Sequence, residues 1–371
     1  MESSEINIKL ISEPVMGVSR ARNTGASHAD HEILVFLDAD NLISDLFLET
    51  VFYKFTDTSI GAATIKTLAE QNSINRGNNN AGLPTECTFI QGDIHDDEAY
   101  FKLADHNFDV VCQFHLFQPA EIQRDIDLFT GHCDQYVFIS SASAYQKPVR
   151  HHVITEDVPL INPYWQYSDN KAQMEAILQN QSGLPYTIVR PSHTSRNEFI
   201  PAVGDGDVIA HRLLARKPVI VHGDGTSLWT ITHSTDFAPP FVKLLGNDAA
   251  LNDHFHLTSD NAYMWNEIYA ATARALGLED EPTVAHIPTD TLVRYNPAWV
   301  GPLLGDKTWS VVFDNSKIKS VVGDFRSDTT LDEFIQLIMP YFHERAKSFE
   351  TDAEYEALAD RIIAEQGALG S

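Results

Sequence analysis

The alternation of short apolar runs with amphipathic stretches from Thr88 onward constrains the fold more than any other feature of the sequence. The runs FDVVCQF (108–114) and QYVFISSAS (135–143) have the length and side chains of buried strands, and IQRDIDLFTGH (122–132) between them has helical spacing. Strands that alternate with helices pair in parallel and are covered by helices on both faces. The sequence therefore predicts an α/β fold with a doubly wound parallel sheet.

The same pattern continues beyond this core and then changes. Residues 169–181 have helical spacing and 186–192 read as a further strand, whereas residues from about 193 to 310 have mixed character and are predicted to form most of a smaller C-terminal lobe. A last helix is expected from Thr330, because Thr330 and Glu333 have capping-box spacing. The tail, residues 346–371, is predicted to be an acidic surface helix.

Composition excludes several classes of partner. Asp and Glu outnumber Lys and Arg by 52 to 26, and the net charge of -26 opposes binding to nucleic acid and to anionic membranes. The three cysteines, Cys87, Cys112 and Cys133, are too few for a disulfide framework. No apolar run approaches the roughly 18 residues of a spanning helix, and the N-terminal stretch does not resemble a signal peptide. A soluble cytoplasmic protein is expected.

One group of residues suggests chemistry. Tyr167 and Lys171 are four residues apart, so on one helix they share a face, where an ammonium would lower the phenol pKa and make Tyr167 an acid/base group. Ser141 follows a predicted strand and would lie at the carboxyl edge of the sheet, where ligands of such sheets bind. Each feature alone also has an ordinary explanation, a chance helical pair and a serine that caps a turn.

Together these residues resemble the extended short-chain dehydrogenase/reductases, the NAD-dependent epimerase/dehydratase family. The pattern is Ser141, Tyr145, the pair Tyr167 and Lys171, and a strand ending in Arg190, and the resemblance covers roughly residues 72–345. It implies a Rossmann-like fold with a substrate lobe, Ser141, Tyr167 and Lys171 as catalytic residues, and Lys171 and Arg190 at the cofactor. It also implies a small-molecule substrate, such as a nucleotide sugar, and suggests a homodimer.

The resemblance also locates further cofactor contacts. Asp93 and Ile94 would meet the adenine, and Phe114 would lie along the cofactor. Asn75 and Arg76 occupy the place where a carboxylate commonly holds the adenine ribose of NAD. An amide and a guanidinium suit a 2'-phosphate better than a diol, so NADP is favoured slightly over NAD. A solvated turn arginine is the alternative.

The first 71 residues depart from that family. The glycine-rich turn that should follow the first strand is missing, and GVSRARNTG (17–25) followed by a strand ending at Asp38 and Asp40 resembles part of a family 2 GT-A glycosyltransferase. That resemblance implies Mg²⁺ or Mn²⁺ at Asp38 and Asp40. The strand at 32–38 either completes the dehydrogenase sheet, which puts the two carboxylates near the cofactor pyrophosphate, or packs separately and leaves an open sheet edge.

Three functions therefore stay open on the sequence. The first is an NAD(P)-dependent oxidoreductase or epimerase/dehydratase that acts on a nucleotide sugar or a similar hydroxylated substrate, with Tyr167 as the acid/base. The second is a non-catalytic chimeric protein with a Rossmann-like fold, motivated by the missing glycine-rich turn. The third is a metal-dependent glycosyltransferase, motivated by Asp38 and Asp40.

Overall fold

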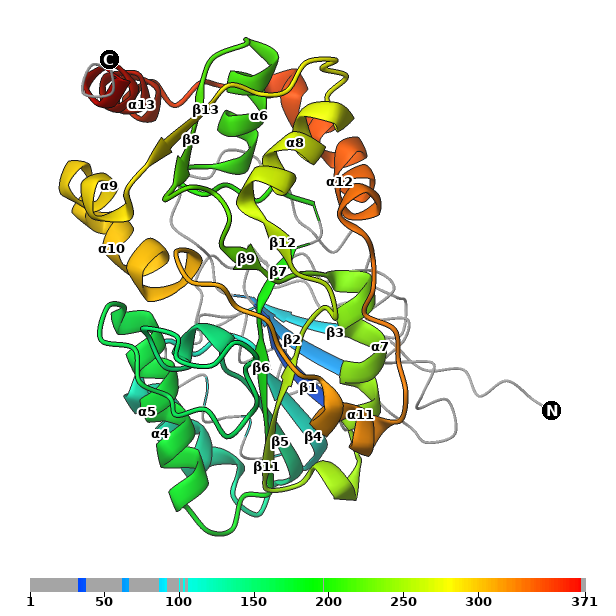
Figure 1. The fold of residues 1–371 in the computed structure, drawn as a ribbon. Coiled ribbons are helices and arrows are strands. Elements are labelled where there is room, and N and C mark those ends of the chain that lie inside the picture. Colours follow the sequence, from blue (N-terminus) through cyan, green and yellow to red (C-terminus); the bar gives the residue numbers. More distant parts are fainter. Residues whose placement is uncertain are drawn as a thin grey trace, which may run out of the picture.

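A computed structural model describes the backbone of residues 33–37, 62–66 and 87–91, then Tyr100, Leu103, and residues 106–195 and 197–367. One seven-stranded parallel sheet organises these residues, in the strand order β3-β2-β1-β4-β5-β6-β11 (Figure 1). Its strands are β1 (Ile33–Leu37), β2 (Ala62–Lys66), β3 (Cys87–Gln91), β4 (Phe108–Gln113), β5 (Cys133–Ile139), β6 (Tyr186–Pro191) and β11 (Asp253–Leu257). The predicted α/β fold with a parallel sheet is confirmed, and six of the strands follow the Rossmann order.

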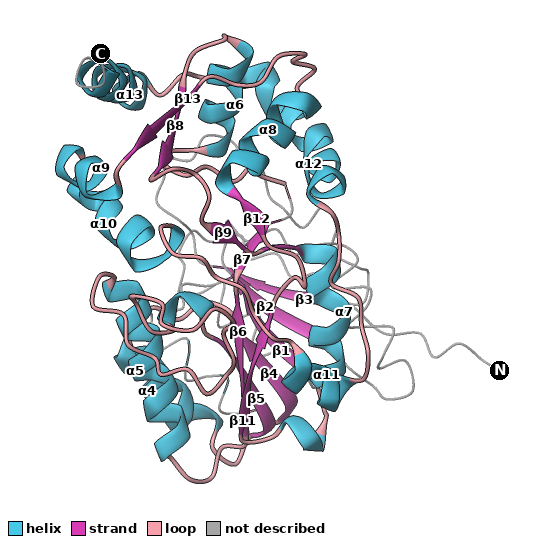
Figure 2. Cartoon of the chain, viewed as in Figure 1, coloured by secondary structure: helices cyan, strands magenta, loops and turns pink. Residues whose placement is uncertain are grey.

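Helices cover both faces of the sheet. On one face α4 (Pro119–Phe129) and α5 (Gln166–Asn180) pack on β4 to β6, and on the other α7 (Ser234–Leu244) and α11 (Ser316–Val322) pack on the same strands and on β11 (Figures 1 and 2). Successive residues of one strand serve opposite cores: Val110 and Cys112 join the α7 side, and Val111 joins the α4 side. This is why the strands read as continuous apolar runs.

Strand β1 lies between β4 and β2, with Ile33 opposite Val110 and Ala62. This is the pairing that the first of the two sequence alternatives requires, because β1 supplies the strand at which the order of the sheet reverses. The division of the chain at residue 71 stays a prediction. Six predicted site residues lie outside the described part of the chain: Asp38, Asp40, Asn75, Arg76, Asp93 and Ile94.

A second lobe stands on the carboxyl edge of the sheet and has its own core (Figure 1). Short strands pair within it, β8 with β13, β9 with β12 and β10 with β7. Their bounds are β7 (His193–Ser195), β8 (Val219–His222), β9 (Leu228–Trp229), β10 (Ile231–His233), β12 (Tyr263–Met264) and β13 (Val284–Ile287). The helices are α6 (Gly206–Leu214), α8 (Trp265–Ala275), α9 (Thr289–Tyr295), α10 (Val300–Pro302), α12 (Leu331–Arg345) and α13 (Ala353–Gly367).

The chain segments that form the lobe differ from those that the sequence predicts. Helix α7 and strand β11 fall within residues 193–310, yet they pack on the sheet, because Phe237, Phe241 and Phe255 belong to its core. The lobe instead recruits α12 and α13 from beyond residue 330. Thr330 caps α12 in the expected capping box with Glu333, and the helix continues through Pro340 to Arg345 without ending there. No helix in the described ranges is long and apolar enough to span a bilayer.

Candidate active site

Two elements bring the predicted catalytic residues together at the carboxyl edge of the sheet. Strand β5 ends at Ile139, and Ser141 then caps a short 3-10 turn over Ala142–Ala144 by accepting a hydrogen bond from the backbone N–H of Ser143. Helix α5 begins at Gln166, three residues earlier than the sequence predicts, so Tyr167 stands in its first turn. Lys171 follows one turn later on the same helix.

Three serine hydroxyls form one hydrogen-bonded group beside Tyr167. The Oγ atoms of Ser141 and Ser143 are 2.8 Å apart, and Ser143 Oγ lies 2.7 Å from Ser168 Oγ on α5. Burial raises the Tyr167 pKa, and the nearby Ser141 hydroxyl acts in the opposite direction without offsetting it. The phenol is therefore protonated at neutral pH.

Lys171 does not have the effect on Tyr167 that the sequence predicts. Its Nζ donates a 2.8 Å hydrogen bond to the carbonyl oxygen of Ile139 and lies 5.8 Å from the centre of the Tyr167 ring. Burial lowers the pKa of Lys171 to about 7, although Glu175 and Glu121 act in the opposite direction. The expected lowering of the Tyr167 pKa is therefore wrong for this structure, because the ammonium loses part of its charge at neutral pH and burial dominates at the phenol.

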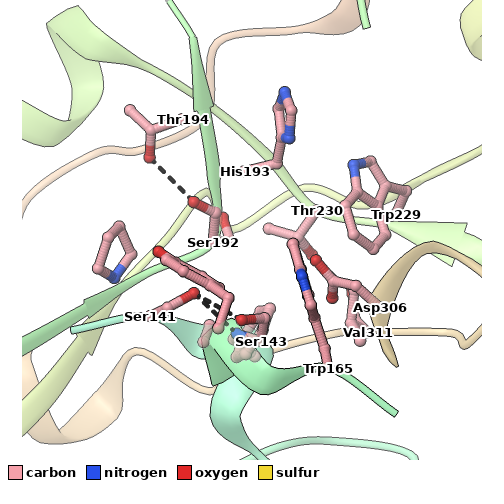
Figure 3. Close-up of a pocket in the computed structure, with 14 residues that line it drawn as sticks. Ser141, Ser143, Trp165, Ser192, His193, Thr194, Trp229, Thr230, Asp306 and Val311 are labelled. Carbon is pink, nitrogen blue, oxygen red and sulfur yellow. Dashed lines mark hydrogen bonds between the residues drawn. The ribbon is translucent and has the colours of Figure 1, made fainter. Parts of the chain in front are cut away.

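The serine and the tyrosine open onto a cavity of about 280 Å³ between the sheet and the lobe (Figure 3). Strand ends and loops of both parts line it: Ser141, Ala142, Ser143, Trp165, Tyr167, Pro191, Ser192, His193, Thr194, Trp229, Thr230, Asp306, Val311 and Phe313. Hydroxyl and aromatic side chains predominate in this list. A cavity of this size and lining suits a small polar molecule with some apolar surface.

Asn162 ties the two sides of the cavity together. Its buried amide donates to the carbonyl oxygens of Ser143, at 2.8 Å, and of Gly305, at 2.7 Å. Gly301 packs against the indole of Trp165 and Gly305 against its Cβ, and a Cβ atom on Gly301 would stand 2.4 Å from Trp165 Cδ1. The turn that carries Asp306 is therefore held in a fixed position beside the predicted catalytic group.

Burial shifts the pKa values of two titratable groups on the lobe side of the cavity, Asp306 and His193. Burial raises the pKa of Asp306 to about 6, against the lowering influence of Lys147 and Lys307. Burial and the neighbouring Lys307 lower the pKa of His193 to about 3, so its imidazole is neutral at physiological pH. Lys307 itself is tied by a 2.7 Å hydrogen bond to the carbonyl oxygen of Pro201.

Arg190 is engaged inside the fold and not in the cavity. Its guanidinium, 3% exposed, donates to Glu175 through Nε and Nη2, with Nη2 2.7 Å from Oε2, and to the Tyr145 hydroxyl and the Glu156 carbonyl through Nη1. Each of its nitrogens is thus occupied by a buried partner. The structure does not place Arg190 at the cofactor, although the sequence predicts it there. Moving the guanidinium into the cavity would leave Glu175 buried without its counter-ion.

The other predicted ligand contacts have less support. Phe114 is half-buried, packs 5.6 Å from the ring of Phe241 and does not line the cavity. Asp38 and Asp40, expected to hold a metal, lie outside the described residues. Within the part of the chain that the structure describes, no group of three or more His, Cys, Asp or Glu side chains is arranged to hold a metal ion.

The described residues fit the nicotinamide end of a dinucleotide. Two hydroxyl groups, on Ser141 and Tyr167, and the buried ammonium of Lys171 meet at the end of a central parallel strand, and this donor set suits ribose hydroxyls and a reacting oxygen. The phosphate end would lie after β1, in residues that are not described. The fit therefore concerns one end of the cofactor.

Sequence reasoning did not identify Asp306, His193, Trp165 or Trp229, which all line the cavity. These residues stand in four separated segments and carry no recognisable spacing. A lone Asp between Gly305 and Lys307 has no sequence signal of its own, and only the approach of the lobe to the sheet brings it to the site.

Comparisons with known proteins agree with this architecture. A curated relative from Arabidopsis thaliana, chloroplast stem-loop binding protein of 41 kDa b, is 26% identical over 218 residues, which are 58% of this chain and 53% of the relative. The chain thus matches about half the length of that relative.

Two solved structures share the fold at low identity. UDP-glucose 4-epimerase from Bifidobacterium longum, in complex with NAD+ and UDP, is 17% identical with a TM-score of 0.64, over 86% of this chain and 100% of the other. The dTDP-glucose 4,6-dehydratase from Bacillus anthracis, in complex with NAD, is 15% identical with a TM-score of 0.64, over 85% and 98% of the two chains. The sequence also matches the NAD dependent epimerase/dehydratase family over residues 58–257, more than half of the chain. The chain therefore belongs to the NAD dependent epimerase/dehydratase family.

Proposed function

We propose that the protein is an NAD(P)-dependent oxidoreductase or epimerase/dehydratase that acts on a nucleotide sugar or a similar hydroxylated substrate. The observation that carries the proposal is the joint position of Ser141 and Tyr167 on one cavity, with Lys171 buried beside them. A strand end and a helix start are needed to assemble this group. A chance helical pair would not also face a cavity together with a strand-end serine.

In the proposed mechanism the two hydroxyls act on one substrate oxygen. Ser141 donates a hydrogen bond that orients this oxygen, and Tyr167, protonated at neutral pH, donates its proton to a carbonyl or takes the proton of an alcohol in the reverse direction. Lys171 would hold the ribose of the cofactor next to Tyr167. A bound nicotinamide supplies the hydride chemistry.

The choice of dinucleotide and the assembly are part of the proposal. Known members of the family depend on NAD, as the family description states. For this chain we favour NADP slightly, because Asn75 and Arg76 replace the usual carboxylate. We further propose a cytoplasmic homodimer.

The decisive experiment pairs cofactor binding with one substitution. Wild-type protein should give a saturable change in NADPH or NADH fluorescence, and Tyr167→Phe should keep this binding but lose turnover by about 10²- to 10⁴-fold, since it removes only the proton donor. Tyr186→Phe is the matched control, because Tyr186 is the first residue of β6 and the cavity lies at the other end of that strand. Absence of cofactor binding at high micromolar concentration, or full activity of Tyr167→Phe, contradicts the proposal.

Two other functions are kept as alternatives with their own tests. A metal-dependent glycosyltransferase requires that Mn²⁺ with a sugar nucleotide raises the melting temperature and that Asp40→Ala abolishes the effect. A non-catalytic protein could share a role with the relative named for stem-loop binding. The net charge of -26 opposes that role, so we expect no retardation of an RNA stem-loop in a gel at physiological salt.

A further inference from the structure

We infer that Asp306 is a second proton-transfer residue of the cavity, the base that takes a proton from the carbon next to a substrate carbonyl. The inference rests on the proposed function and narrows it, because this step serves to invert such a carbon or to expel a leaving group beyond it, and alcohol oxidation alone does not need it. Three features lead to it: the place of Asp306 opposite the predicted catalytic hydroxyls, its basicity, and the rigid turn that bears it.

Asp306 and the predicted catalytic hydroxyls line the cavity from different parts of the fold (Figure 3). Ser141 and Tyr167 stand at the end of β5 and the start of α5, whereas Asp306 belongs to a turn of the lobe. Burial raises the Tyr167 pKa and the Asp306 carboxylate raises it further, so the two groups lie near each other across the cavity. A substrate whose carbonyl oxygen is bound by Ser141 and Tyr167 would therefore have Asp306 beside the neighbouring carbon atoms.

Among the described residues that line the cavity, Asp306 is the one that is a base at neutral pH. The Tyr167 phenol is protonated, and burial together with Lys307 lowers the pKa of His193 to about 3, which makes its imidazole a weak base. Burial raises the pKa of Asp306 to about 6, and Lys147 and Lys307 oppose that rise. A carboxylate with this pKa is ionised at pH 7 and can still return its proton, as a general acid/base must.

Two lysines favour the ionised form of Asp306 without occupying its oxygens. Lys147 is 2% exposed, and its Nζ has no hydrogen-bond partner among the described residues. Lys307 Nζ donates to the Pro201 carbonyl at 2.7 Å instead. Both ammonium groups act on Asp306 through space, and within the described part of the chain neither forms a hydrogen bond or an ion pair with it. The carboxylate can therefore receive a proton from a ligand.

The position of Asp306 is fixed by its backbone, which forms a turn of π-helix over Leu303–Lys307. Asn162 donates to the carbonyl oxygen of Gly305 inside this turn at 2.7 Å. The same Asn162 amide donates to the carbonyl oxygen of Ser143, in the turn that Ser141 caps. Turns of π-helix are rare and are frequent at functional sites. The link through Asn162 holds Asp306 and the predicted catalytic serine at a set separation, as proton transfer to and from one substrate requires.

The inferred step moves two protons and balances without a further reactant. The Asp306 carboxylate takes the proton from the carbon next to the carbonyl, and the electron pair of the broken C–H bond forms a carbon–carbon double bond. The π electron pair of the carbonyl moves to its oxygen, which takes the proton of Tyr167 while Ser141 keeps its hydrogen bond. An enol results. The reverse transfers restore the ketone, and after the Asp306 proton has exchanged with water the carbon receives a solvent hydrogen.

Exchange of this carbon-bound hydrogen with solvent tests the inference. The probe is dTDP-4-keto-6-deoxyglucose, a nucleotide sugar with a ketone in its ring, incubated in D₂O with the protein and NADP+, which cannot reduce a ketone. The wild type should incorporate deuterium next to the ketone at least about 10²-fold faster than buffer does. Asp306→Asn, which keeps the shape of the side chain, should bind the probe as the wild type does in calorimetry and lose at least about 10²-fold of the exchange rate.

Asp280→Asn is the matched control for the loss of a carboxylate, because the Asp280 side chain is 87% exposed, and it should exchange at the wild-type rate. Wild-type exchange no faster than in buffer overturns the inference, and so does an undiminished rate in folded Asp306→Asn. The inference and the proposed function fail separately. A wild type that binds NADPH without catalysing exchange rejects the inference alone, whereas Asp306-dependent exchange by a protein that binds no NADPH rejects the cofactor function alone.

Discussion

At the scale of single residues, burial decides the chemistry of the site more than neighbouring charge does. Lys171 is 2% exposed, and burial lowers its pKa to about 7 from an ordinary value of 10.5. Burial also raises the pKa of Tyr167, despite the opposing effect of Ser141. Burial is therefore the main cause of the pKa shifts of both groups.

Lys171 should make the stability of the protein depend on pH. Because its pKa is lower in the folded than in the unfolded state, the unfolded state binds more protons between about pH 7 and 10.5, and stability falls as pH falls through this range. Lys171→Met removes this contribution. Urea unfolding from pH 7 to 9 should therefore show a shallower rise of the unfolding free energy in Lys171→Met, by up to about 1.4 kcal/mol per pH unit. Parallel curves for the two proteins would contradict this expectation.

At the scale of elements, the C-terminal helix α13 is part of the lobe core. Tyr355, Ala359 and Ile362 are buried in that core, so the helix uses one apolar face for packing, while the sequence alone predicts only a surface helix. The partly buried Glu356 accepts hydrogen bonds from Arg212 Nη1 at 2.6 Å and from Lys217 Nζ at 2.7 Å. Arg212 is 1% exposed, so this contact pairs a charge that water cannot reach.

Substitution of Glu356 tests whether this ion pair fastens α13. Glu356→Gln should lower the unfolding free energy by roughly 2 to 3 kcal/mol, because it leaves the buried Arg212 with only part of its counter-charge. Asp332→Asn is the control, since Asp332 pairs with Arg274 at 2.9 Å but is 71% exposed, and its loss should cost less than about 0.5 kcal/mol. Equal costs in chemical denaturation would mean that burial at α13 does not strengthen the pair.

At the scale of the whole molecule, β1 joins two halves of one sheet. Strands β2 and β3 reach the rest of the sheet only through β1, and β4 would have a free edge without it. The carboxyl ends of β1 and β4 flank the point where the strand order reverses, which is where sheets of this kind bind their ligands. The stability of the sheet and the formation of the cofactor site therefore depend on the same strand.

A proline in β1 should destabilise the whole sheet. Val35 pairs with Thr64 on one side and with Cys112 on the other, so its backbone N–H lies in an interior ladder. Val35→Pro removes that donor and should cost at least about 3 kcal/mol, while Val35→Ile keeps it. Urea unfolding followed by circular dichroism measures both variants. A Val35→Pro protein with an unchanged midpoint would mean that the sheet does not need β1.

Parts of the fold could be read from local pattern. The apolar runs at 108–114 and 186–192 become β4 and β6 almost at the predicted bounds, and Thr330 with Glu333 caps α12 as its spacing predicts. Local pattern does not predict the start of α5, because its cap position is Trp165, whose side chain makes no capping hydrogen bond. Helix α7 lies in the range predicted for the lobe but packs on the sheet, because nothing in its local sequence says which core its phenylalanines enter.

The sequence by itself determined the parallel sheet and the placement of Tyr167 and Lys171 on one helix face, because strand periodicity and a four-residue helical spacing are local properties. Ser141 joined this pair through the resemblance to the family. Only the tertiary structure decided that Arg190 belongs to a buried ion pair with Glu175, that burial raises the Tyr167 pKa, and that Asp306 reaches the cavity. Burial and contact between distant segments arise because α5 packs on the sheet and the lobe packs on its carboxyl edge. Neither property can be read from the spacing of residues along the chain.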